Sequence, residues 1–255
     1  MKIMRSFALA VVLGTAALAA HPAAQDTAWT TLTGRLDHGA NTNNAEELKA
    51  ARAGALRDVV TPVPGVPVPT ARYAVSYADY RLAAHPDTSG AEQADYLDEA
   101  DQQLREAIRT DATFADAYGL LSAVLGLRIA AASTVAAKMQ YGPESSTMLD
   151  RGVSLEPNNP RLLVVAAISL FRRPADHGGD PQQAEVLLRH AVEAGEKEAS
   201  TGRAWPNWGR FDAHFWLGQV LAARGDVGGA RAEYTKALVV APDAEAVRTL
   251  LASLK

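Results

Sequence analysis

The amino-acid sequence predicts an all-α protein in which antiparallel helix pairs stack side by side. Apolar residues recur at helical spacing over residues 45–60 and over most of the chain after residue 70. Strand patterns are nearly absent, and the apolar run over residues 164–168 has helical flanks, so we interpret it as a buried helix. The third observation is one residue spacing that returns four times along the chain.

This repeated spacing consists of a small residue, a large apolar residue four positions later, and a second small residue three positions after that. Its copies are Ala100, Leu104, Ala107; Ser145, Leu149, Gly152; Ala184, Leu188, Ala191; and Ala230, Tyr234, Ala237. Small residues let a neighbouring helix approach closely, and the large residue fills the gap between helices. The copies begin 45, 39 and 46 residues apart, a period typical of helical repeat arrays, whose units bury their apolar faces by stacking. We therefore expect about four helix pairs, followed by a capping helix over residues 244–254.

The first 20 residues have the pattern of a secretory signal peptide. Lys2 and Arg5 precede an uncharged stretch over residues 7–20, which is too short to span a bilayer core of about 30 Å. The small residues Ala17 and Ala19 predict cleavage between residues 19 and 24; an uncleaved membrane anchor is the alternative. We expect a periplasmic or secreted protein with no stable membrane insertion after cleavage. The absence of cysteine fits such an oxidising compartment.

Residues 21–69 are predicted to form an N-terminal segment with one helix and a proline-rich strap. Residues 25–44 are polar and rich in turn formers, whereas residues 45–60 carry a helical apolar pattern with Asn43 and Glu46 as a capping pair. Four prolines between residues 62 and 69 exclude a regular helix there and favour an extended strap. The helical repeat domain is expected to span residues 70–255.

The last repeat copy, between Phe211 and Asp243, carries the most informative residues. They are Leu217, Gly218, Leu221, Ala230, Tyr234, Ala237 and Pro242. At these offsets the copy resembles the tetratricopeptide repeat (TPR) family, and the resemblance extends over residues 70–255. The chain departs from the family's usual 34-residue repeat through insertions near residues 131–143, 172–181 and 195–207, so the resemblance is to an exported bacterial type with inter-helix insertions. The resemblance implies a right-handed superhelix whose concave groove is lined by the first helix of each pair.

The resemblance also implies which side chains line the groove. The family's groove offsets fall on Asp116, Gly119 and Ala123, and in later copies on Arg161, Val164, Ile168, Phe171, Asp212, Phe215 and Gln219. Trp208 joins this candidate site because three of the four tryptophans cluster in residues 205–216. The set is mainly apolar and lacks the lysine and asparagine pattern with which some family members clamp a terminal carboxylate.

Two questions stay open at the level of sequence. The groove either accepts an apolar ligand or peptide segment, or it is filled by the chain's own prolines and valines over residues 62–69. The tryptophan-rich segment either presents a binding surface or packs a long loop onto the neighbouring helices.

The chain carries no pattern of catalytic residues. We find no nucleophile elbow, phosphate loop or metalloprotease motif, and therefore expect no enzyme and no cofactor. Asp176, His177 and Asp180 share one loop, but we interpret Asp180 as the N-cap of a helix that begins at Pro181 rather than as a metal ligand. A net charge of −4 gives no basic surplus, which argues against a nucleic-acid partner.

These observations favour a non-enzymatic periplasmic or secreted TPR scaffold that mediates protein–protein interaction. The expected partner is a protein or peptide of unknown identity. The alternative is a small-ligand-binding component associated with envelope transport, in which a small apolar ligand occupies the groove.

Overall fold

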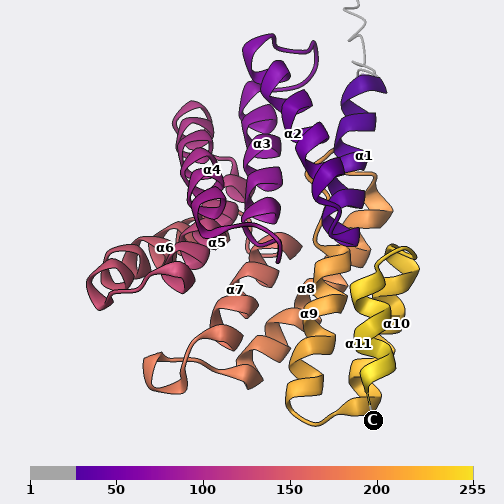
Figure 1. Ribbon diagram of the computed structural model, residues 1–255. Coiled ribbons are helices and arrows are strands. Elements are labelled where there is room, and N and C mark those ends of the chain that lie inside the picture. The colour runs from indigo at the N-terminus through magenta and orange to yellow at the C-terminus, as the bar shows by residue number, and fades with distance from the viewer. Residues whose placement is uncertain (1–26, 255) are drawn as a thin grey trace, which may run out of the picture.

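The computed structural model describes residues 27–254, so the predicted signal peptide over residues 1–20 and its cleavage site lie outside the described range. Within that range the chain is helical and contains no strand (Figure 1), which confirms the all-α prediction. The elements are α1 (Thr27–Thr42), α2 (Ala45–Val60), α3 (Val68–Ala83), α4 (Gly90–Thr110), α5 (Ala115–Ala131), α6 (Val135–Leu155), α7 (Pro160–Arg172), the short 3₁₀ helix η1 (Ala175–His177), α8 (Pro181–Thr201), α9 (Arg210–Ala223), α10 (Val227–Val240) and α11 (Glu245–Ser253).

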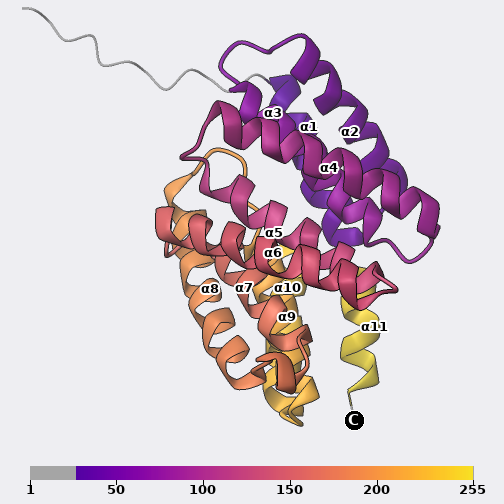
Figure 2. The ribbon, with the colours of Figure 1, turned by 90° about the vertical axis from the view of Figure 1, so that its left-hand side faces the viewer.

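Consecutive helices pack in pairs that follow one another in chain order. The pairs are α1–α2, α3–α4, α5–α6, α7–α8 and α9–α10, and α11 packs on α10 as a cap. The second helix of each pair also contacts the first helix of the next, and Figures 1 and 2 show the curved stack that results. The first helices α1, α3, α5, α7 and α9 touch one another in the same order. We call the surface that these five helices share the inner face.

The repeated spacing found in the sequence falls on the second helix of four pairs, α4, α6, α8 and α10. All its residues in α4, α8 and α10 are buried. In the last copy, Tyr234 packs directly on Gly218 of α9, where an added Cβ would lie 2.5 Å from a ring carbon. The large residue of this copy therefore fills the gap to the neighbouring helix, as the pattern predicted.

The N-terminal part differs from the prediction of a single helix between residues 21 and 69. Residues 27–42 form α1, which pairs with α2, so the stack has five pairs rather than about four. Threonines and glycines give this segment a weak local preference for helix, but Trp29 and Leu36 are buried in the core. Tertiary packing therefore decides its conformation. The N-cap of α2 is Asn44, which accepts from the Glu47 backbone N–H at 3.1 Å, one position later than the expected capping pair.

The proline-rich strap connects α2 to α3 over residues 61–67. The helix that follows starts at Val68, two residues before the expected boundary, and Pro69 therefore lies in its first turn. Proline is tolerated at that position, since the first N–H groups of a helix have no partner within it. Val66 of the strap is half-buried against the N-terminal part of the core.

Candidate functional site

One side of the inner face is closed by a contact between helices that are far apart in the sequence. Arg81 of α3 pairs with Asp212 of α9 at 3.0 Å and also donates to the backbone oxygen of Ala40 in α1. Burial disfavours the charged form of Arg81, but the Asp212 carboxylate, together with Tyr77 and Tyr80, outweighs this effect and raises the pKa of Arg81 above its usual range. A permanent cation thus ties α1, α3 and α9 together.

The connection between α8 and α9 folds into the inner face. We call residues 202–209 the plug. The Trp205 ring lies 5.4 Å from the ring of Tyr73 and 5.9 Å from that of Trp29, both edge-on. The Trp208 ring stacks on Tyr77 at a centroid distance of 5.1 Å. Both indoles are buried, so for them the packing interpretation of the tryptophan cluster is confirmed.

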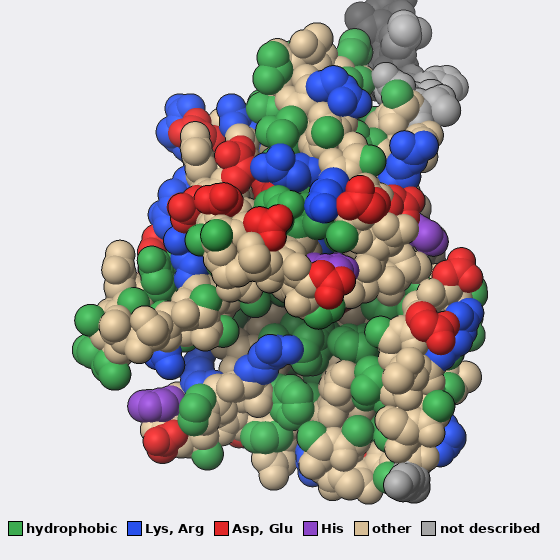
Figure 3. Space-filling model, in the orientation of Figure 1, with side chains coloured by type: hydrophobic (Ala, Val, Ile, Leu, Met, Phe, Trp, Pro, Cys, Tyr) green, Lys and Arg blue, Asp and Glu red, His purple; other side chains and the backbone are tan. Residues whose placement is uncertain are grey.

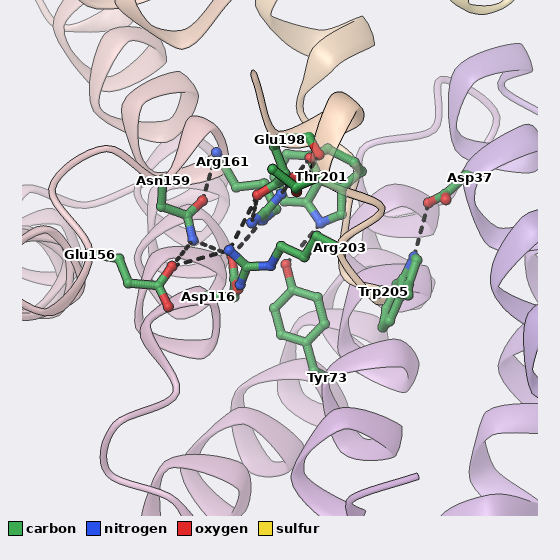
Figure 4. A network of polar contacts seen from close by, with 11 residues as sticks. Asp37, Tyr73, Asp116, Glu156, Asn159, Arg161, Glu198, Thr201, Arg203 and Trp205 are labelled. Atoms are coloured by element: carbon green, nitrogen blue, oxygen red, sulfur yellow. Dashed lines mark hydrogen bonds and ion pairs between the residues drawn. The ribbon is translucent and has the colours of Figure 1, made fainter. Parts of the chain in front are cut away.

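A network of buried charges anchors the plug to the helices around it (Figure 4). Arg161 of α7 donates through Nε to Asp116 of α5 at 2.5 Å, and its two Nη atoms bind the Glu198 carboxylate of α8 at 2.5 and 2.9 Å. Arg161 also donates to the backbone oxygen of Trp208 at 2.9 Å. Arg203, inside the plug, bonds to the other Asp116 oxygen at 2.9 Å and to Glu198 at 3.2 Å.

The charges of this network compensate one another. Burial disfavours the charge of Arg161, yet Asp116 and Glu198 raise its pKa above the usual range. Asn159, the N-cap of α7, donates a further hydrogen bond to Asp116 at 2.8 Å. Both oxygens of Asp116 are engaged, and the bonds of the network hold the plug in one position on α5, α7 and α8.

The predicted site residues divide into two groups along α7 and α9. At the N-terminal ends of these helices, next to the plug, Arg161, Val164, Trp208 and Asp212 are buried. Further along the two helices, Ile168, Phe171, Phe215 and Gln219 are only half-buried. The surface is hollowed between α7 and α9, and hydrophobic side chains are exposed there (Figure 3). We call the surface formed by these four half-buried residues the open hollow.

The edge of the open hollow combines an aromatic ring with a cation. Trp216 packs edge-on against Phe215, with 5.4 Å between the ring centroids. The Arg172 guanidinium lies 5.0 Å from the centroid of the Trp216 ring, within the range of a cation–π contact. The open hollow thus combines apolar side chains and one amide, with a positive charge on the neighbouring Trp216 ring.

Sequence reasoning did not anticipate what fills the inner face. Neither of the two occupants considered for the groove was the plug, whose path depends on contacts with α1, α3 and α5. Sequence reasoning also missed Asp37, because α1 was not expected to be a helix. The Asp37 carboxylate accepts a hydrogen bond from the Trp205 indole at 3.1 Å, and burial raises its pKa to about 7.

The loop over residues 172–181 has a structural role at Asp180. Asp180 is the N-cap of α8: its side chain accepts from the Gln183 backbone N–H at 2.9 Å, and Pro181 opens the helix, as predicted. The side chains of Asp176 and His177 are exposed to solvent. In the part of the chain that the structure describes, no three His, Asp or Glu side chains gather in a way that would hold a metal ion.

None of the helices between residues 27 and 254 combines the length and the apolar character that crossing a membrane requires.

Comparison with known proteins places the fold. No protein-family model and no curated protein sequence matches this chain. Among solved structures, a thermophilic TPR protein from Thermus thermophilus is similar, with a TM-score of 0.59, 17% identity, and coverage of 88% of this chain and 98% of that one. The haemophore HusA from Porphyromonas gingivalis is similar with a TM-score of 0.62, 23% identity, and coverage of 78% and 96%. These likenesses establish a TPR-like helical repeat fold, as the sequence predicted.

Proposed function

We propose that this chain is a non-enzymatic scaffold, exported to the periplasm or the cell exterior, that holds an apolar segment of a protein partner in the open hollow. The observation that carries this proposal is the half-exposed set Ile168, Phe171, Phe215 and Gln219 on two neighbouring helices of the inner face. The likeness to a TPR protein supports a scaffold, because helical repeats present extended concave surfaces to their partners.

The chemistry of the open hollow favours an amphipathic partner segment. Ile168, Phe171 and Phe215 offer apolar area for one or two large anchoring side chains, and interface energy concentrates at such anchors. The half-buried Gln219 amide offers both a donor and an acceptor to a partner's backbone. Arg172, above the Trp216 ring, favours a carboxylate beside the anchor. The expected segment is therefore aliphatic or aromatic with an adjacent acidic residue.

Site-specific photo-crosslinking tests this proposal. A photoreactive residue at position 219 of the full-length chain should form a discrete adduct in the cells that produce it. The same residue at position 239 is the control, since Val239 lies on α10 and is 72% exposed. Adding Phe215→Asp, which also removes packing against Phe211 and Tyr234, should lower the urea midpoint but leave the protein folded by circular dichroism, and it should abolish the adduct at 219. The same adducts at both positions, or an adduct that survives Phe215→Asp, would refute a site in the open hollow.

Export has its own test. Fractionation of cells should recover the protein outside the cytoplasm, with a mature N-terminus between residues 19 and 24. Deletion of residues 1–20 should retain it in the cytoplasm. Full-length protein that remains cytoplasmic would contradict export and leave the fold unaffected.

A second candidate function is the carriage of a small apolar molecule, associated with envelope transport. The observation in its favour is the likeness to a haemophore over 78% of this chain, together with the aromatic character of the open hollow. Titration with hemin, followed by its visible absorbance, tests this candidate. Saturable binding to the wild type that is weakened in Phe171→Asp supports a carrier. A linear, unsaturable response that is the same in the wild type and in Phe171→Asp contradicts it.

A further inference from the structure

A cleft of about 360 Å³ lies beside the plug, separate from the open hollow. Its walls come from α1, the end of α8, the plug, the start of α9 and the end of α10. The lining includes Asp37 and Asn41 of α1, Asn207 and Trp208 of the plug, and Phe211 of α9. The volume suits a molecule of a few to about ten non-hydrogen atoms, which is smaller than most drug-sized ligands.

The cations that line this cleft are already paired. Arg203 binds Asp116 and Glu198, and Arg210 donates through Nε to Glu196 at 2.8 Å. Glu198, the second acid of the cleft, is held by Arg161 and Arg203. The lining charges that belong to these ion pairs therefore cancel.

Asp37 is the exception among the lining residues. Its Oδ1 accepts the hydrogen bond from Trp205, and no ion pair to Asp37 exists among residues 27–254. The pKa of this carboxyl is raised to about 7, first by burial and further by Asp212, while Trp205, Arg161 and Arg81 act in the opposite direction. A carboxyl in this position lacks a cation: the groups that face it leave its charged form under-stabilised at neutral pH.

We propose that the cleft binds a small organic cation with a primary ammonium group. The ammonium donates to the second oxygen of Asp37, the side-chain amides of Asn41 and Asn207 accept its remaining N–H bonds, and the alkyl part packs on Trp208 and Phe211. The carboxylate, the two amides and the indole of the cleft are therefore complementary to the ammonium group and alkyl part of the ligand. This inference is independent of the proposed partner in the open hollow, since none of the four residues that form the open hollow lines the cleft.

Calorimetric titration at pH 8 with ethanolamine and with putrescine tests the proposal, and the tryptophan fluorescence of the same samples gives a second readout. Both amines should bind saturably and change the emission. Asp37→Asn keeps an acceptor for Trp205 and should weaken binding at least about tenfold, the effect of losing one charge-assisted hydrogen bond. Asp176→Asn removes an equal charge from a loop residue that is 79% exposed and should leave binding unchanged.

The pH dependence of the wild-type protein supplies a test that needs no variant. An amine binds the ionised form of Asp37, so its affinity should fall by up to about tenfold per pH unit below pH 7, and binding at pH 6 should release a proton to the buffer. The proposal is overturned if neither amine binds at millimolar concentration, if Asp37→Asn binds equally well, or if tetramethylammonium, which has no N–H donor, binds as tightly as ethanolamine.

Discussion

The indole Nε1 of Trp208 donates a hydrogen bond to the Tyr73 hydroxyl over 2.8 Å and so joins residues 135 positions apart. Both side chains are buried, and burial raises the pKa of Tyr73 well above its usual range, which keeps the hydroxyl neutral. The same indole stacks on Tyr77, with 19° between the ring planes. This contact fixes the plug to α3 and thereby decides which part of the inner face is accessible.

The Trp208–Tyr73 hydrogen bond should be measurable in the stability of the fold. Tyr73→Phe removes the acceptor and leaves a buried N–H unpaired, which costs about 1–3 kcal/mol of unfolding free energy. Trp208→Phe removes the donor and some packing, for a similar cost. Urea denaturation of the two single variants and the double variant provides the measurement. Because the double variant leaves no unpaired indole N–H, its loss should be smaller than the sum, and strictly additive losses would contradict the hydrogen bond.

In the last helix pair, Gly218 of α9 lies so close to Tyr234 of α10 that any side chain at this position would be crowded. An added Cβ would lie 2.5 and 2.6 Å from two ring carbons of Tyr234, and the tyrosine side chain is buried. Gly218→Ala should therefore destabilise the protein by about 1–3 kcal/mol through overpacking. Gly126→Ala is the matched control: it also lies inside a helix, and an added Cβ would meet nothing within 4 Å. That change should stabilise the protein by about 0.5–1 kcal/mol, and thermal melts of the two variants and the wild type provide the measurement.

The helix pairs that the sequence revealed are those whose second helix carries the small–large–small spacing. In α4, α8 and α10 the large residue is leucine or tyrosine and is buried. At the corresponding turn of α2, Ala51 is followed by Ala55, so the large residue is absent and the spacing does not appear. The first pair was therefore missed, because its core is completed by Trp29 and Leu36 of α1 rather than by a local pattern.

The candidate site was predictable only as far as the groove offsets implied by the TPR resemblance reach. The offsets placed Arg161 and Asp212 on the inner-facing side of α7 and α9, and the structure shows both side chains turned toward α5 and α3 respectively. Which residues stay accessible depends on the plug, whose position rests on contacts such as Trp205 with Asp37, 168 positions apart. No local sequence signal encodes a contact of that separation.

Asp79 gives the stability of the fold a specific pH dependence. Its side chain is fully buried on α3, pairs with Arg52 through one oxygen and leaves the other without a partner. Burial raises its pKa from 3.8 to about 7, although Arg52 acts in the opposite direction. The folded state then binds more protons than the unfolded state between these values. The stability that protonation of this carboxyl contributes is complete below the unfolded pKa of 3.8 and is lost as the pH rises to about 7.

Asp79→Asn should flatten this dependence, because an amide does not titrate. The difference between the unfolding free energies at pH 5 and pH 7.5 should shrink by up to about 2–3 kcal/mol relative to the wild type. Urea titrations across that range provide the measurement, and Asp176→Asn, at the exposed loop, should retain the wild-type slope. An unchanged slope in Asp79→Asn would show that Asp79 ionises in the folded state at its ordinary pKa.

Arg161 should be the residue whose loss releases the plug. Its side chain is 2% exposed and binds Asp116, Glu198 and the Trp208 backbone. Arg161→Met leaves two carboxylates short of a cation in a buried site, and the expected cost is about 3–5 kcal/mol. Arg161→Lys should recover only part of this, since an ammonium cannot bind both carboxylates in the planar geometry of a guanidinium.

The plug offers a direct readout of this effect, because trypsin cleaves after Arg203. In the wild type, Arg203 is held by Asp116 and Glu198, so cleavage there should be slow under native conditions. Arg161→Met should accelerate it well beyond any change at Arg189, whose pair with Glu185 is on the surface. Arg189→Met, the control, should leave both the stability and the rate of cleavage after Arg203 close to the wild type. Equal cleavage rates in all three proteins would mean that the buried ion pairs do not hold the plug, and that the stacking of Trp208 on Tyr77 is sufficient.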